Sequence, residues 1–246
     1  MIRNRIYLST IDPNAQTLCR QYGFGLEIAE YCTAWNLDDK YLETNSVVKE
    51  KIKEIPKRLF HAPFSELFPC AIDPKARAMA ESRYRQAIEL AKSYGAIKVV
   101  IHGGYNPWIY YPEWYVEQSI LFWKEFLKED PEIEIVLENV LETQPDWLLC
   151  IIKGVEDPRL RMCLDIGHVN AYSPVSVMEW LEACAPFISH FHIHNNYGTR
   201  DQHNALDEGT IPIKEFLLRA EELCPDATVT LELMEAESSV SWLLEG

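Results

Sequence analysis

Short hydrophobic runs alternate with longer amphipathic stretches along the whole chain. Eight runs are predicted as strands, at residues 6–10, 25–30, 58–63, 98–104, 134–140, 161–168, 188–195 and 228–234. Several of them are nearly continuous in Val, Ile, Leu and Phe, which is typical of parallel strands that are covered on both faces. The pattern therefore favours a sheet with helices packed against it rather than an exposed antiparallel sheet.

The stretches between these runs have helical periodicity and helix-end signals. Helices are predicted at 13–22, 37–54, 74–94, 112–128, 144–153, 174–184 and 212–223, with a short one at 238–245. The helix at 74–94 has Asp73 and Pro74 at its start and Gly95 at its end, as N-terminal and C-terminal caps require. An alternation repeated eight times predicts α/β architecture with a single (β/α)8 TIM barrel over residues 1–246. An open doubly wound sheet is the alternative, but no strand is followed by GxGxxG or GxxxxGK[ST].

Imidazole and carboxylate side chains are concentrated at or just beyond the ends of the predicted strands. They are His61, His102, Glu138, Asp165, His168, His192, His194 and Glu232, with Asp201 and His203 in the segment after the seventh strand. In a parallel barrel, the carboxyl ends of the strands converge on one face. Nitrogen and carboxylate ligands without thiolate suit zinc, manganese, iron or cobalt. The sequence therefore predicts a divalent metal cofactor, zinc or manganese, with one to three ions.

Single members of this set also have structural explanations. A lone histidine at a strand end is usually a hydrogen-bonded structural residue, whereas Glu138 and Glu232 in apolar strands are costly to bury without a partner. Strand periodicity places His190, His192 and His194 on one face, and His190 lies one layer deeper, where a structural role is expected. The metal hypothesis therefore rests on the whole set of residues at the strand ends and not on any single one of them.

Composition limits the partners. The 246 residues carry 23 Lys and Arg against 38 Asp and Glu, a net charge of −15, which disfavours a nucleic-acid partner. The seven cysteines form no CxxC pair, and most lie in apolar or helical stretches, which indicates reduced, buried thiols. The N-terminal residues lack the apolar segment of a signal peptide, and no run approaches membrane-spanning length. We expect a cytoplasmic protein without a membrane partner; a homo-oligomer is compatible with the sequence, which does not fix the oligomeric state.

Several motifs together resemble a known family. They are FHAP, IHGG, LEN, CLDIGHVNAY, HIHNN, DQH followed by EG, and LEL, between about residues 58 and 234. The chain resembles the xylose-isomerase-like TIM barrel superfamily, which holds sugar isomerases and epimerases together with AP endonuclease family 2, the endonuclease IV group. This resemblance implies a metal centre at the C-terminal face of the barrel.

The two branches of the superfamily imply nested ligand sets. In the isomerase and epimerase branch, one ion, usually manganese or a similar metal, is held by the equivalents of Glu138, Asp165, His192 and Glu232, and the two glutamates exchange protons with the substrate. In the endonuclease IV group, three zinc ions use nine side chains, which match His61, His102, Glu138, Asp165, His168, His192, Asp201, His203 and Glu232. All nine keep their residue type. Two positions depart from keto-sugar epimerases: Gln144 replaces a glutamate, and Gly198 replaces an arginine, with Arg200 two residues further on.

The first functional hypothesis is a metal-dependent isomerase or epimerase that acts on a small sugar or sugar phosphate, with Glu138 and Glu232 as catalytic residues. The alternative is a multinuclear zinc phosphoesterase that acts on a small phosphorylated substrate rather than on DNA. A third reading is a barrel that binds a metabolite without turnover. The predicted substrate-binding residues are His194, Tyr105, Trp108 and Arg200. For Trp108 in the aromatic segment 103–115, a pocket wall and packing on the barrel are equal alternatives, whereas Trp114 and Tyr115 are expected to pack.

Overall fold

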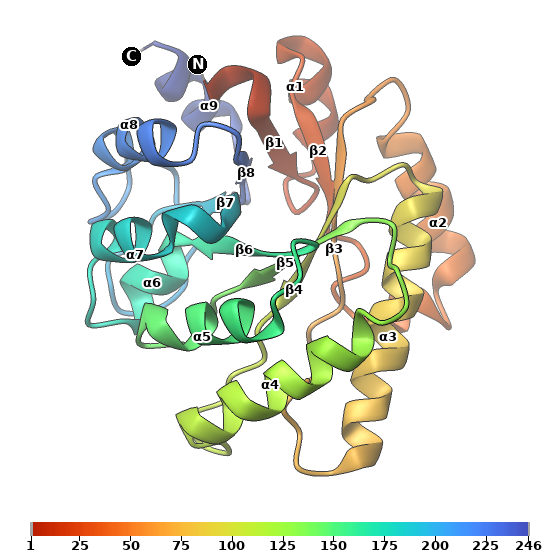
Figure 1. Ribbon diagram of the computed structural model, residues 1–246. Coiled ribbons are helices and arrows are strands. Elements are labelled where there is room, and N and C mark those ends of the chain that lie inside the picture. The colour runs from red at the N-terminus through yellow and green to blue at the C-terminus, as the bar shows by residue number, and fades with distance from the viewer. Residues whose placement is uncertain (1, 246) are drawn as a thin grey trace.

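Eight parallel strands close into a barrel in the computed structural model, which describes residues 2–245 (Figure 1). The strands are β1 (Ile6–Ser9), β2 (Gly25–Ile28), β3 (Arg58–His61), β4 (Lys98–His102), β5 (Glu134–Glu138), β6 (Leu160–Asp165), β7 (Ile188–Ile193) and β8 (Thr228–Leu231). Each strand pairs with its neighbours in chain order, and β1 pairs with β8, with Tyr7 opposite Thr230. The predicted (β/α)8 TIM barrel is confirmed.

Helices surround the ring of strands and cover its outer face (Figure 1). They are η1 (Ile2–Arg5), α1 (Ala15–Tyr22), η2 (Ala34–Leu37), α2 (Tyr41–Lys51), α3 (Pro74–Ser93), α4 (Pro112–Phe126), α5 (Pro145–Val155), α6 (Ile166–Tyr172), α7 (Val177–Cys184), η3 (Ala185–Phe187), α8 (Ile213–Leu223) and α9 (Glu237–Leu244). At α3, the Asp73 side chain accepts a hydrogen bond from the Lys75 amide, as the cap signals predicted. The other predicted helices are present with shifted ends.

The prediction of one strand over 161–168 was wrong at its end. β6 ends at Asp165, and α6 begins at the next residue. The Asp165 side chain accepts a hydrogen bond of 2.7 Å from the His168 amide, so it caps a helix instead of extending a strand. This cap places the His168 ring on the first turn of α6, directly above the end of β6.

The alternation of side chains along each strand separates two kinds of interior. Residues that point outward, such as Val99, Ile101 and Leu137, belong to the large hydrophobic core between strands and helices. The inward positions contribute only a small apolar cluster of Val100, Val136 and Cys163. Because residues two apart on a strand face the same side, Lys98 and His102 point into the barrel with Val100, and Glu134 and Glu138 do so with Val136. The inside of the barrel is therefore polar at both ends.

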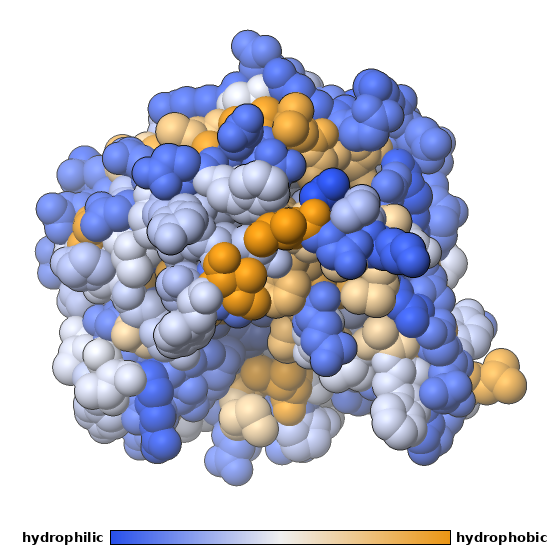
Figure 2. Space-filling model, turned by 90° about the horizontal axis from the view of Figure 1, so that it is seen from below, coloured by the Kyte–Doolittle hydropathy of each residue, from blue (hydrophilic) through white to orange (hydrophobic). Residues whose placement is uncertain are grey.

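The surface agrees with the acidic composition. The face in Figure 2 is mostly hydrophilic, with hydrophobic residues gathered near its centre. No helix in residues 2–245 has the length and apolar character needed to cross a bilayer. Five of the seven cysteines are buried, as expected for most of them, whereas Cys32 is half-buried and Cys150 is exposed. Burial raises the pKa of Cys19 to about 12, which keeps that thiol protonated.

Candidate metal centre

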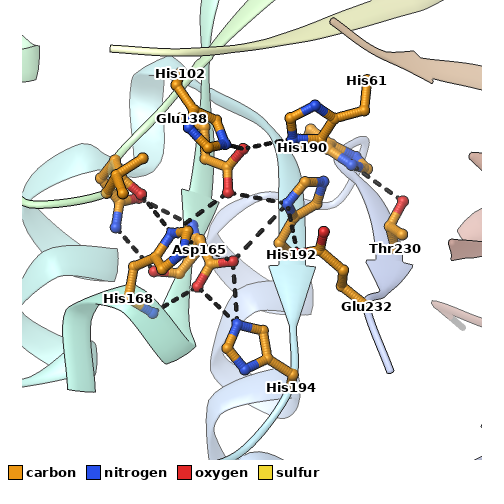
Figure 3. Close-up of polar contacts among 12 residues, drawn as sticks. His61, His102, Glu138, Asp165, His168, His190, His192, His194, Thr230 and Glu232 are labelled. Atoms are coloured by element: carbon orange, nitrogen blue, oxygen red, sulfur yellow. Dashed lines mark hydrogen bonds and ion pairs between the residues drawn. The ribbon is translucent and has the colours of Figure 1, made fainter. Parts of the chain in front are cut away.

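A group of four side chains lies at the carboxyl ends of β5 to β8, near the middle of the rim (Figure 3). It consists of Glu138, Asp165, His192 and Glu232, and ligand atoms of all four lie within 4.8 Å of one another. The Nδ1 atom of His192 is 3.1 Å from Glu138 Oε1 and 3.3 Å from Glu232 Oε2. Asp165 pairs directly with His192 in the β6–β7 register, so the sheet itself sets this spacing. We call these four residues the core group.

A second group shares Glu138 and extends toward β3 and β4. It is formed by His61, His102 and Glu138. His61 Nε2 and His102 Nε2 lie 3.2 Å and 3.4 Å from Glu138 Oε2. The Nδ1 atom of His61 is 2.9 Å from the carbonyl of Ala62, which accepts its hydrogen and leaves Nε2 to face the carboxylate. The single carboxylate of Glu138 thus faces two neighbouring positions at which an ion could bind, one in the core group and one beside His61 and His102.

A third group forms around Asp201 in the segment after β7. Its ligand atoms that lie within 4.8 Å of one another come from His194, Asp201 and His203. His203 Nε2 is 2.9 Å from Asp201 Oδ2, and His194 Nε2 is 3.4 Å from Asp201 Oδ1. His168, another member of the nine-residue set, also reaches Asp201, with its Nε2 atom 3.3 Å from Oδ2. Three imidazoles therefore face one carboxylate.

Two observations indicate that these groups suit a cation. Asp201 Oδ1 and His194 Nδ1 are buried side-chain atoms without a hydrogen-bond partner, and such atoms are costly unless something binds them. The donors are imidazole nitrogens and carboxylate oxygens, the set that zinc and similar divalent ions prefer. The residues present therefore fit one to three divalent ions.

Two carboxylates of the core group, those of Glu138 and Glu232, have lowered pKa values. Burial would raise the pKa of Glu138, but the charge of the adjacent His192 ring lowers it well below its ordinary value. Burial also raises the pKa of Glu232, but the charge of His192 again has the larger effect and lowers this pKa to about 2. By contrast, burial lowers the pKa of His102 to about 3, which leaves this ring neutral and ready to donate a lone pair.

Two of the four predicted substrate-binding residues are buried and two are exposed. The His194 ring is fully buried, and Tyr105 is buried against the rings of Tyr115 and Trp147. Trp108 and Arg200 lie in segments that follow β4 and β7 at the same end of the barrel, and both are exposed. The alternative that Trp108 packs on the barrel was wrong, because its side chain is 83% exposed. The expected packing is found for Tyr115, which is fully buried, and Trp114 is half-buried, with its indole nitrogen donating to the carbonyl of Cys70.

Glu27 on β2 is a buried acidic residue that the sequence reasoning did not single out. Its carboxylate contacts both His190 and His192. The signal for it was present, because Glu27 lies in the apolar run GLEI as Glu138 lies in EIVLE. Another buried acid, Glu142, accepts hydrogen bonds from the Tyr115 hydroxyl and the Val140 amide and lies outside all the ligand groups.

Comparison with known proteins identifies the family of the chain. The model of the family described as xylose isomerase-like TIM barrel matches residues 18–245. The chain belongs to this family. The resemblance inferred from its motifs is thus confirmed, and it now extends over nearly the whole chain.

Curated relatives of the chain include two proteins of Methanocaldococcus jannaschii. The uncharacterized protein MJ1311 is 34% identical over 183 residues, which cover 70% of this chain and 62% of that protein. The uncharacterized protein MJ1614 is 24% identical over 168 residues, which cover 65% of this chain and 64% of that protein. The matches thus span less than two thirds of these relatives' length, and their names give no activity.

Solved structures share the fold over nearly its full length. A D-tagatose 3-epimerase-like protein is 28% identical, with a TM-score of 0.77 and coverage of 98% of this chain and 96% of that one. The TTHB071 protein from Thermus thermophilus, soaked with ZnCl2, is 23% identical, with a TM-score of 0.79 and coverage of 98% and 97%. The IOLI protein with a bound zinc atom is 20% identical, with a TM-score of 0.75 and coverage of 96% and 91%. All three share the barrel fold of the chain, and the first of them is named as similar to an epimerase.

Proposed function

We propose that this protein is a metal-dependent isomerase or epimerase that acts on a small sugar or sugar phosphate. The observation that carries the proposal is the core group, in which Glu138 and Glu232 both reach His192 Nδ1. These two carboxylates surround one possible ion position together with the His192 ring and Asp165. Such an arrangement suits both tasks of the enzyme, which are to hold a divalent ion and to move a proton. The likeness to a D-tagatose 3-epimerase-like protein supports the substrate class.

Glu138 and Glu232 divide the proton transfer between them. One carboxylate removes the proton from the carbon beside the substrate carbonyl, and the other returns a proton from the opposite side, through an enediolate. A bound divalent ion supplies polarisation of the carbonyl and hydroxyl oxygens, held by the four core residues. The Glu138 carboxylate is buried and the Glu232 side chain is 12% exposed, so Glu232 lies nearer the opening of the barrel; the exposed Trp108 and Arg200 are available for contact with the rest of the sugar.

Exchange of substrate hydrogen with solvent tests this proposal. Candidate ketoses and ketose phosphates are incubated in D2O with the Mn²⁺-loaded or Zn²⁺-loaded protein, and deuterium at the carbon beside the carbonyl is measured by NMR. Glu138→Gln and Glu232→Gln should each lower the exchange rate by about 10²–10⁴-fold, because each removes an acid–base group. Glu142→Gln is the matched control, since this buried glutamate belongs to no ligand group. Full exchange in either core variant would rule out the two-glutamate mechanism.

The second and third groups favour one other candidate, a multinuclear zinc phosphoesterase for small substrates. His61, His102, Asp201 and His203 are not needed by a single-ion isomerase, yet they lie in ligand groups around the core. Metal analysis of protein purified without chelator separates the candidates: two or three zinc ions per chain with hydrolysis of p-nitrophenyl phosphate favours the phosphoesterase. One ion per chain with hydrogen exchange on a ketose favours the isomerase.

A further inference from the structure

A buried carboxylate lies directly below the core group, inside the barrel. Glu27 Oε1 is 3.0 Å from His192 Nε2, and Glu27 Oε2 is 3.1 Å from His190 Nε2. The Thr230 hydroxyl donates a further hydrogen bond to Oε2. All four side chains are fully buried. Glu27 comes from β2 whereas His192 comes from β7, two strands that are not neighbours, so the contact crosses the inside of the barrel.

The two ring nitrogens of His192 have different surroundings. Nδ1 faces the core group, with Glu138, Glu232 and Asp165 oxygens at 3.1, 3.3 and 3.8 Å. Nε2 faces Glu27. A carboxylate only accepts hydrogen bonds, so both ring nitrogens can donate in the metal-free protein. A cation bound between the core carboxylates would take the place of the hydrogen on Nδ1, whereas the hydrogen on Nε2 would stay bonded to Glu27. The ring would then present its Nδ1 lone pair to the ion.

We propose that Glu27 is a positioning residue of the metal centre: it accepts the Nε2 hydrogen of His192 and so fixes Nδ1 as the ligand atom. The inference rests on the proposed metal-dependent function and adds to it a residue outside both ligand sets. A carboxylate behind a ligating imidazole fixes its ring orientation and makes the metal-facing nitrogen a stronger donor.

The hydrogen bonds of Glu27 are divided in the way this role requires. Oε2 is already satisfied by His190, one layer deeper in the barrel, and by Thr230, which pairs with His192 in the β7–β8 register. Oε1 has His192 as its hydrogen-bond partner. His190 is in turn held on its other nitrogen by the Thr228 hydroxyl at 2.7 Å. The contacts of Oε2 thus hold the carboxylate still, and its remaining oxygen is aimed at His192.

Zinc affinity measured on the whole chain tests the inference. Competition with a chromophoric chelator gives the Kd for Zn²⁺ in the wild type, in Glu27→Gln and in Glu142→Gln. Glu27→Gln keeps the shape of the side chain and removes its charge, and we expect about a 10–100-fold weaker Kd, the usual effect of losing such a partner. Glu142→Gln removes another fully buried glutamate that does not contact His192, and its Kd should stay within about twofold of the wild type.

A spectroscopic measurement keeps the test decisive if Glu27→Gln folds poorly. In the wild-type protein labelled with ¹⁵N-histidine and loaded with ¹¹³Cd²⁺, the metal coupling should appear on Nδ1 of His192 and the hydrogen on Nε2. Coupling through Nε2, or a folded Glu27→Gln with wild-type zinc affinity, would overturn the role of Glu27 while leaving the proposed function intact. A wild-type protein that binds neither Zn²⁺ nor Mn²⁺ would overturn the proposed function, and the role of Glu27 with it.

Discussion

The two ends of the barrel interior are both polar, but they are polar in different ways. At the amino end of the strands, Lys98 pairs with Glu134 at 3.3 Å and donates to the carbonyl of Ser189, whose hydroxyl donates to Glu134. At the carboxyl end, no Lys or Arg within residues 2–245 forms a salt bridge with a carboxylate of the core group or with Asp201. The carboxylates there lie beside imidazole rings instead.

This contrast separates a structural polar cluster from a functional one. At the amino end, one cation matches one anion, and the cluster is complete without further charge. At the carboxyl end, carboxylates outnumber fixed cations, and buried negative charge of this kind is stabilised by a bound metal ion. The arrangement therefore predicts that changes at the two ends will differ in their effect on stability and on metal binding.

Metal loading should give the largest effect. Adding Zn²⁺ to EDTA-treated protein should raise the free energy of unfolding by about 4 kcal/mol when zinc is a thousandfold above its Kd, because the ion binds only the folded rim. Thermal unfolding at fixed protein concentration measures this shift. Glu138→Gln should reduce it strongly, since Glu138 belongs to two ligand groups. Identical melting curves in zinc and in EDTA would show that no ion stabilises the carboxyl end, which would contradict the proposed difference between the two ends.

Gly167→Ala should have the next largest effect, and it acts on the carboxyl end alone. A Cβ atom at Gly167 would lie 1.8 Å from Cε1 of the buried His194 ring, so the ring or α6 must move. We expect a loss of about 3 kcal/mol in urea unfolding, together with weaker zinc binding at the group around Asp201. Gly154→Ala is the control, because a Cβ at this helical glycine would meet only the side chain of Ile120, whose terminal Cδ1 atom can move aside. A Gly167 variant as stable as the wild type would show that His194 is not tightly held.

The barrel and most of its rim could be predicted from the sequence because both follow from short-range periodicity. Alternation of strand and helix patterns defines the barrel, and residues such as Glu138 and His192 are identified by their place at strand ends. The end of β6 was harder, since Asp165 and His168 continue an apolar run in which the helix-cap signal of Asp165 was overlooked.

Contacts across the barrel could not be predicted in the same way. Glu27 meets partners 163 and 165 residues away in the sequence, and only the closed barrel brings them together. The group around Asp201 depends on the path of the segment after β7, where His203 has a positive φ of 49° that no periodic pattern specifies. The relative positions of His168 and His194 around Asp201 are therefore a property of the folded structure alone.

A change at the amino end should lower stability and leave metal binding unaltered. Lys98→Met removes the buried cation and leaves Glu134, whose side chain is one third exposed, without its ionic partner. We expect a loss of about 2 kcal/mol in urea unfolding, less than for a fully buried pair because water reaches Glu134. Lys128→Met, which breaks an exposed pair with Glu125, should change stability by no more than about 0.5 kcal/mol. Altered zinc affinity in the Lys98 variant would show that the two ends are coupled.

Trp108→Ala should have the smallest effect on stability and sharpens the comparison within the carboxyl end itself. The exposed indole contributes little to the core, so the free energy of unfolding should change by no more than about 0.5 kcal/mol. If the indole contacts the sugar, KM rises by roughly tenfold, equivalent to about 1.4 kcal/mol of binding energy, while kcat stays constant because Trp108 lies outside the ligand groups. Tyr111→Ala, at another exposed aromatic of the same segment, serves as the control. A fall in kcat with unchanged KM would place Trp108 in the chemistry of the rim instead of in substrate contact.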